Sequence, residues 1–340
     1  MTIKTIIAWD LGATKCAAAL LDYHTETKAL TCKRHINVKI RSCESLDALV
    51  STLETALELT LSAADAICIG AAGQYKNGVV ELEEGYPYRM DFARLAKEQH
   101  WPPFAILHDY SPIVCGTFTP YIDDPQHVNR LNHAAINPEG RRVALGIGTG
   151  IGLKDGILLE DGNFWLGTNE MGHIGVITPP LTEDVFVKRH QALMHFFRSE
   201  ALLAENEALT FEKLLANQGM ARMHAFFDRG AKHKTAEEIG DLVRDGKANE
   251  TLAAFAWYTG LLVGTVQLSF MPDGGIWLSG GVVLNHPEVF SHPDFFRGIH
   301  ASPAYLNLRE QFPLGILCGK AHAFMGCGYY ASKRLLPCGD

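Results

Sequence analysis

The sequence has no surplus of positive charge: 30 Lys and Arg stand against 38 Asp and Glu, and the formal net charge is −8. Because nucleic-acid backbones and anionic membranes are bound by clustered Lys and Arg, we expect no nucleic-acid partner. The eight cysteines form no Cys-x-x-Cys pair that could combine with histidines in a zinc finger, which argues against a structural zinc site. The scattered cysteines are typical of reduced thiols in a cytoplasmic protein. A small molecule is therefore the expected partner.

The chain also lacks an apolar opening run long enough for a secretory signal, because Asp10 interrupts it. One later stretch, residues 251–271, carries no formal charge and is long enough to cross a bilayer. It contains three Thr, a Gln, a Ser and two Gly. We therefore expect a buried core helix and no membrane partner.

Strand and helix patterns alternate along the chain, which indicates an α/β fold, and 340 residues are enough for two domains. The first strands are predicted on either side of the turn "DLGAT", and Ser45 is the predicted N-cap of a helix that follows. The remaining expected elements are a buried strand at 66–73, a hairpin at 77–78, a helix near 91–99, a strand at 104–110, a strand-turn-strand at 142–162, a mostly helical segment at 183–271 and a buried strand within 274–283.

The most informative feature is that the chain uses one device twice: a strand, a glycine-rich turn that carries a Thr, and a second strand. The first turn is "DLGAT" and the second lies in "LGIGTGIG" (145–152). The second turn fails the Walker pattern at Leu153 and the G-x-G-x-x-G pattern at Ile151. Turns without bulky side chains let backbone N–H groups approach an anion, and the hydroxyls of Thr14 and Thr149 add donors. We expect both turns to bind phosphate.

Two charged residues flank the first turn. Asp10 stands where the first strand ends, and a carboxylate there can hold a water on a magnesium ion that neutralises nucleotide phosphates. The simpler reading is an aspartate that only closes the turn. Lys15 either adds positive charge to the phosphate site or is an exposed strand lysine.

Taken together and in this order, "DLGAT", "GIGTGIG" and "GGIWLSGGVV" resemble the sugar kinase–Hsp70–actin superfamily. Within it, "HD" (108–109), "NEMGH" (169–173) and "FEKLL" (211–215) are similar to the bacterial glucokinase family. The resemblance covers nearly the whole chain. It implies a two-domain α/β, ribonuclease H-like fold with an interdomain cleft. Its expected parts are a small N-terminal domain of residues 1–112 closed by a C-terminal helix within about 319–340, and a large domain of residues 113–318.

The resemblance also assigns the site residues. It places the catalytic aspartate at Asp109, at the end of a strand, where a carboxylate accepts the proton of a sugar hydroxyl that attacks the γ-phosphate. The alternative is an aspartate that only caps the following helix. Acceptors suit the hydroxyl donors of a sugar, and the implied sugar contacts are His108, Asp109, Glu170, His173 and Glu212. The implied nucleotide contacts are Asp10, Gly12, Ala13, Thr14, Lys15, Gly148, Thr149, Gly150, Gly280 and Gly281.

Several positions depart from the family pattern. His108 stands where the family has Asn, Glu83 and Glu84 stand where it has Thr and Asn, and Ala13 replaces a Gly. The family's "SGPG" is "ANQG" at 216–219. Because Asn donates and accepts while Glu only accepts, the preferred hexose stays open. The related repressor-and-kinase family has a cysteine zinc site after its "GH" and, in its repressors, an N-terminal DNA-binding motif, and this sequence has neither.

The expected function is ATP- and Mg2+-dependent phosphorylation of a hexose, with D-glucose to glucose 6-phosphate as the leading reaction. The alternatives are a kinase for another hexose, a sugar-binding sensor that turns over weakly or not at all, and an Hsp70- or actin-like ATPase. Similar proteins are commonly homodimers, so a homodimer is a further expectation.

Overall fold

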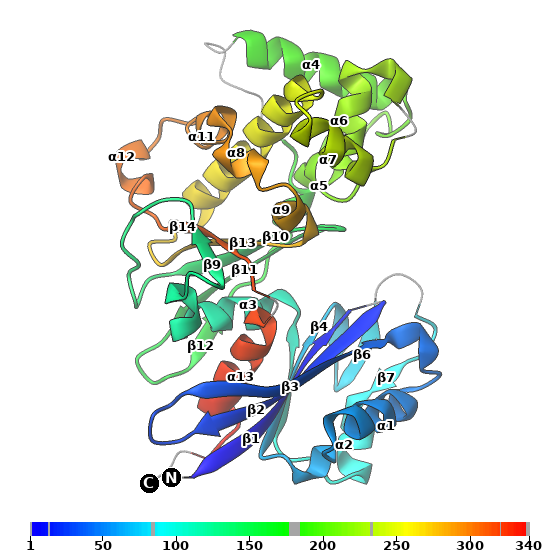
Figure 1. Ribbon diagram of the computed structural model, residues 1–340, viewed down its shortest axis with the longest axis vertical. Helices are drawn as coiled ribbons and strands as arrows, with labels where there is room; N and C mark the ends of the chain where they lie inside the picture. The colour runs from blue at the N-terminus through cyan, green and yellow to red at the C-terminus, as the bar shows by residue number, and fades with distance from the viewer. Residues whose placement is uncertain are drawn as a thin grey trace. The chain divides into compact units, whose positions relative to one another are not determined.

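The computed structural model describes residues 2–12, 14–82, 86–176, 184–231, 234–319 and 321–337. The chain forms two compact units, whose elements Figure 1 labels: residues 1–128, 156–167 and 319–340 form the first, and residues 129–155 and 168–318 form the second.

The first unit is larger than the small domain expected from the sequence. Residues 113–128 and 156–167, which the sequence assigned to the large domain, pack with the first unit. Helix α3 (Tyr110–Thr117) continues across the expected boundary and packs on α13 (His322–Arg334). Phe164 also contacts α13, because its ring stacks on the ring of Tyr330.

The first unit is built on a five-stranded sheet in the order β3-β2-β1-β4-β8. Its strands are β1 (Ile3–Leu11), β2 (Lys15–His24), β3 (Leu30–Lys39), β4 (Ala66–Ala71) and β8 (Phe104–His108). Strands β1, β4 and β8 run parallel, while β2 is antiparallel to both β1 and β3. The opening hairpin, the buried strand and the strand that ends at the His-Asp pair are thus confirmed, whereas β3 was not predicted.

Alternate side chains of β1 enter two cores, one on each face of this sheet. Trp9 joins the core formed with α1 (Leu46–Leu57) and α2 (Phe92–Glu98), and Ala8 joins the core formed with α13. Ser45 accepts a hydrogen bond from the N–H of Ala48 at 3.1 Å, which confirms the predicted N-cap of α1. A small sheet of β5 (Gly73–Lys76), β6 (Val79–Leu82) and β7 (Met90–Asp91) contains the predicted hairpin.

Two glycines let α3 and α13 approach closely. A Cβ at Gly326 would overlap the carbonyl oxygen of Pro112, and a Cβ at Gly116 would lie 2.6 Å from that of His322. Any larger side chain would push the helices apart. The position of the first turn of α3, next to Asp109, therefore depends on these glycines.

The second sheet has the order β12-β11-β10-β13-β14-β9. Its strands are β9 (Val128–Arg130), β10 (Arg142–Ile147), β11 (Ile151–Leu158), β12 (Phe164–Leu166), β13 (Gly275–Ser279) and β14 (Leu314–Leu317). Strands β10, β13 and β14 run parallel. The predicted strand-turn-strand at 142–162 is confirmed as β10 and β11. The predicted buried strand within 274–283 is confirmed as β13.

The second unit also holds the remaining α-helices of the described residues. They are α4 (Asp184–Ser199), α5 (Phe211–Leu215), α6 (Gly219–Phe227), α7 (Ala236–Arg244), α8 (Asn249–Phe270), α9 (Gly281–Asn285), α10 (Glu288–Ser291), α11 (Pro293–Ile299) and α12 (Leu306–Arg309). Within the described ranges, α8 is the one helix long and apolar enough to cross a membrane, and it is mostly buried. It packs on α11 where a Cβ at Gly260 would overlap the carbonyl oxygen of Phe295, which confirms the predicted core helix.

Candidate active site

The first glycine-rich turn joins β1 to β2 in the first unit. The N–H of Gly12 donates to the carbonyl of Lys15 at 2.9 Å, and the carbonyl of Thr14 accepts from Ile40 at 3.1 Å. The side chains of Thr14 and Lys15 are exposed and free to meet a ligand. Ala13 lies outside the described residues, as do Glu83 and Glu84.

Asp10, at the end of β1, belongs to a pair of carboxylates in this unit. Its pKa is raised, chiefly because surrounding protein removes water from the carboxyl, and further because the negative charge of Asp109 acts on it, while Lys15 opposes the shift. The side chain nevertheless keeps contact with solvent. A cation placed near Asp10 and Asp109 would therefore relieve a repulsion that Lys15 only partly offsets.

Asp109 follows β8 and begins α3. Its N–H donates to the carbonyl of Ala71 at 3.1 Å, and its Oδ1 accepts from the N–H of Tyr110 at 2.9 Å. Behind it, a Cβ at Gly70 would lie 2.9 Å from Cγ of Pro112, so this glycine of β4 lets the first turn of α3 approach the sheet closely. The side chain is 25% exposed, and Nδ1 of His108 lies 2.7 Å from its Oδ1. Asp109 thus caps the helix and still presents a carboxyl group to solvent.

The second glycine-rich turn joins β10 to β11 in the second unit. It is closed by the N–H of Gly148, which donates to the carbonyl of Gly150 at 2.9 Å, and it is tied to the α5–α6 loop by Asn217, whose N–H donates to Gly148 at 2.7 Å. The N–H of Ile151 donates to Oε2 of Glu212 at 2.9 Å, and a Cβ at Gly150 would lie 2.9 Å from the same oxygen. Glu212, a predicted sugar ligand, therefore also holds the second glycine-rich turn in place.

Glu170 and His173, which are also predicted to bind sugar, lie in the same unit at a short 3-10 helix, η4 (Met171–His173). Its N-cap is Glu170, which is exposed, and Nδ1 of His173 lies 3.8 Å from Oε1 of Glu212. Gly172 packs tightly on β11, because a Cβ there would lie 2.9 Å from the Cβ of Ile151. The structure thus brings His173 and Glu212 side by side, with the Glu212 side chain 31% exposed.

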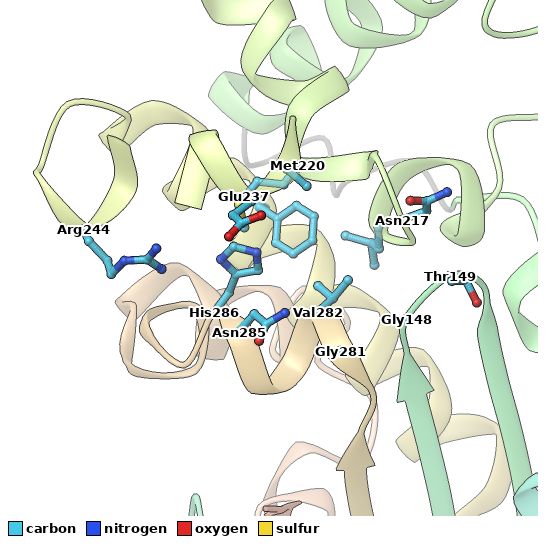
Figure 2. Close-up of a pocket in the computed structure, with 13 residues that line it drawn as sticks. Gly148, Thr149, Asn217, Met220, Glu237, Arg244, Gly281, Val282, Asn285 and His286 are labelled. Carbon is cyan, nitrogen blue, oxygen red and sulfur yellow. The ribbon is translucent and has the colours of Figure 1, made fainter. Parts of the chain in front are cut away.

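A cavity of about 610 Å³ opens beside the second turn (Figure 2). Its volume lies in the range of small-molecule and cofactor sites. Among the described residues, its lining comes from the turn and from the helices that follow it: Gly148, Thr149, Leu215, Asn217, Met220, Ala236, Glu237, Arg244, Phe255, Gly281, Val282, Asn285 and His286.

The two ends of this cavity differ in character. At one end the backbone of Gly148 faces Gly281, since a Cβ at Gly148 would lie 3.7 Å from the Gly281 nitrogen. At the other end Figure 2 shows Glu237, Arg244 and His286, and the His286 ring lies against α7, where a Cβ at Gly240 would be 2.8 Å from its Cε1. One end therefore offers small residues and backbone, and the other offers polar side chains.

The glycine pair after β13 combines a strained and an open position. Gly280 has φ 97°, and a Cβ there would lie 2.5 Å from the carbonyl oxygen of Ile147, whereas a Cβ at Gly281 would meet nothing within 4 Å. Only glycine fits the first position. Gly281 lines the cavity, while Gly280 sets the turn before it.

The sequence did not point to the polar end of the cavity. Glu237 and Arg244 belong to α7, which contains no recognisable motif, whereas Asn285 and His286 lie just after the "GGIWLSGGVV" segment. The two pairs meet only through packing. A glutamate in the first turn of α7 reads as an ordinary favourable charge near a helix N-terminus.

Two α/β units, two glycine-rich turns, an aspartate at the end of a parallel strand and a cavity of nucleotide size define the two-domain sugar kinases. A family model described as Glucokinase matches residues 7–334, and the chain belongs to this family. It is 23% identical over 276 residues to the glucokinase of Saccharophagus degradans. The aligned region covers 79% of this chain and 80% of that protein.

Solved structures show the same fold. A glucokinase from an Antarctic psychrotroph aligns with a TM-score of 0.79 at 16% identity, over 96% of this chain and 98% of that one. The Streptomyces griseus ROK-family glucokinase, in complex with glucose and AMPPNP, aligns with a TM-score of 0.58 at 16% identity, over 95% and 97% of the two chains. The predicted family and the predicted sugar kinase fold are confirmed.

Proposed function

We propose that this protein is a cytoplasmic hexose kinase that transfers the γ-phosphoryl group of ATP to D-glucose and forms glucose 6-phosphate. The observation that carries the proposal is the cavity of about 610 Å³ that begins at the Gly148–Thr149 turn, in a chain of the glucokinase family. The Streptomyces griseus relative, solved with glucose and AMPPNP, supports both ligands.

In this proposal the cavity holds the nucleotide. Its phosphates lie at the end formed by Gly148, Thr149 and Gly281, because bare backbone N–H groups and a hydroxyl are suitable donors to phosphate oxygens. The nucleoside lies toward Glu237 and Asn285, whose side chains can pair with ribose or base.

The first turn supplies the remaining phosphate contacts in this proposal. Gly12, Ala13 and Thr14 offer backbone and a hydroxyl, and Lys15 offers a cation. Gly150 and Gly280 shape the second turn without side chains that would obstruct a phosphate.

Mg2+ fits the residues present. Within the described ranges no cluster of three or more His, Cys, Asp or Glu could hold a metal unaided, but Mg2+ is typically held by one or two carboxylates together with water and phosphate oxygens. Asp10 is the proposed ligand, acting through water. Its pKa is raised chiefly by burial and further by the negative charge of Asp109, and a cation would offset that charge. When bound, Mg2+ would neutralise charge on the transferring phosphates.

Asp109 is the proposed general base. Its partly exposed carboxylate can accept the proton of the attacking 6-hydroxyl, a contribution of about 10²- to 10⁴-fold for a positioned base. The proposed ligands of the other sugar hydroxyls are His108, Glu170, His173 and Glu212. Oε1 of Glu212, which lies toward His173 while Oε2 accepts the Ile151 N–H, can accept a hydrogen bond from a hydroxyl.

A coupled ADP-release assay across a panel of hexoses, with and without Mg2+, tests this function. Glucose-dependent, Mg2+-dependent ADP release is expected. Release on another hexose alone would make this a kinase for that sugar. Tight glucose binding without ADP release would indicate a sensor, and release without any sugar would indicate an ATPase; either result would refute the proposal. A homodimer is proposed alongside it, and analytical ultracentrifugation at assay concentrations would test it.

A further inference from the structure

We propose that His108 is a positioning residue for the general base: its imidazole holds Oδ1 of Asp109, so that Oδ2 alone is left to accept the proton of the sugar hydroxyl. The inference rests on the proposed function. It gives His108 a task beyond the sugar contact that the family pattern places at this position.

The geometry around Asp109 leaves its two oxygens in different situations. Oδ1 accepts the N–H of Tyr110 at 2.9 Å and also lies 2.7 Å from Nδ1 of His108. The structure shows no such neighbour for Oδ2 among the residues it describes. Two partners on one oxygen fix the rotation of the carboxyl group, and the second oxygen remains available.

The short contact requires a proton on Nδ1, in either the neutral or the cationic ring, if it is to be attractive. A carboxylate oxygen and a bare ring nitrogen repel each other at 2.7 Å, so the contact is attractive only if Nδ1 carries the proton. The Nδ1–H tautomer leaves Nε2 as the outward nitrogen. The His108 side chain is 41% exposed, so this nitrogen can meet a ligand while Nδ1 is committed to Asp109.

The backbone on both sides makes this arrangement rigid. His108 is the last residue of β8 and Asp109 is tied to β4 through its N–H, so neither Cα is free to move away. A carboxylate that is held in the reactive orientation before the sugar binds avoids the entropy of finding that orientation in each turnover. Loss of the imidazole should therefore act on the chemical step more than on sugar binding.

The test compares His108→Ala, which removes the imidazole, with His108→Asn, whose amide N–H can reach Oδ1. His195→Ala, at an exposed position on α4 in the other unit, is the matched control. We expect His108→Ala to lower kcat for glucose about 10- to 100-fold with little change in KM for ATP. His108→Asn should recover most of the loss, and His195→Ala should match the wild type.

Two results would overturn the inference. One is a rise in glucose KM in His108→Ala with kcat unchanged, which would make His108 a simple sugar contact. The other is a fall in kcat that His108→Asn does not recover. Absence of ADP release by the wild type on every hexose would instead refute the proposed function itself.

A measurement without turnover tests the same contact. In the protein labelled with 15N-histidine, the NMR signals that His108→Asn removes should show the Nδ1–H tautomer. A predominant Nε2–H tautomer would contradict the inference even in a fully active enzyme.

Discussion

Replacement of Gly281 by Val should weaken nucleotide binding while leaving the fold intact. A Cβ at this position meets nothing within 4 Å, so the valine fits the unliganded protein without strain. Its methyl groups extend into the phosphate end of the cavity, where Gly148 is the facing residue. Loss of one hydrogen bond to a charged phosphate costs about 1.5–3 kcal/mol, which corresponds to a roughly 10- to 150-fold weaker Kd.

The neighbouring Gly280→Ala is the matched control, with the opposite expected outcome. At φ 97° and ψ 163° the backbone is in a region that is essentially restricted to glycine, and the added Cβ would lie 2.5 Å from the carbonyl oxygen of Ile147. Such strain costs about 1–3 kcal/mol, so Tm should fall by several degrees.

Titration with a non-hydrolysable ATP analogue gives Kd for each variant, and thermal unfolding followed by circular dichroism gives Tm. Wild-type affinity in Gly281→Val would show that the phosphates do not lie at this end of the cavity. An equal loss of Tm in both variants would show that the protein has no room for a side chain at position 281.

Three further predictions follow from the packing and charges. Gly326→Ala should lower Tm, because its Cβ overlaps the Pro112 carbonyl and about 1–3 kcal/mol of overpacking outweighs the gain in helix propensity. In the control Gly328→Ala the added Cβ meets only the ends of Leu side chains, so Tm should change little. Equal Tm values for the two variants would contradict this prediction. The raised pKa of Asp10 means that its ionised form destabilises the fold at pH values above the unfolded-state pKa. Asp10→Asn should therefore unfold at a higher urea concentration than the wild type at neutral pH, and this difference should vanish as the pH falls into the acid range. A difference that grows on acidification would refute the raised pKa of Asp10. Glu212→Gln keeps an acceptor for Ile151 and should raise glucose KM about 10-fold with an unchanged Tm; an unchanged KM would remove Glu212 from the sugar site.

Much of the fold could be predicted because local signals agreed with the final packing. The Ser45 cap, the apolar spacing of α1 and the wholly apolar β4 each indicate one structure from a short window. Strand β3 was missed because it pairs only with β2, at the edge of the sheet, and most of its side chains are polar and partly exposed. The alternation of Leu30, Ile36 and Val38 with polar residues is the strand signal that this segment carries.

The candidate site divides in the same way. The turns at Asp10 and Thr149 are contiguous in sequence and were found from their glycines and threonines. The polar end of the cavity was not, because Glu237 and His286 meet only when α7 packs near α9. The contact between His108 and Asp109 is likewise visible only in the structure, because adjacency in sequence does not specify which carboxylate oxygen the ring nitrogen meets.

The most direct test of the account is the kinetics of Asp109→Asn with saturating ATP and glucose. The amide keeps the size of the side chain and can still accept the Tyr110 N–H, so the fold and glucose binding should be preserved. We predict that kcat falls by at least about 10²-fold with glucose Kd nearly unchanged. An Asn variant that phosphorylates glucose at the wild-type rate would contradict the assignment of Asp109 as the general base.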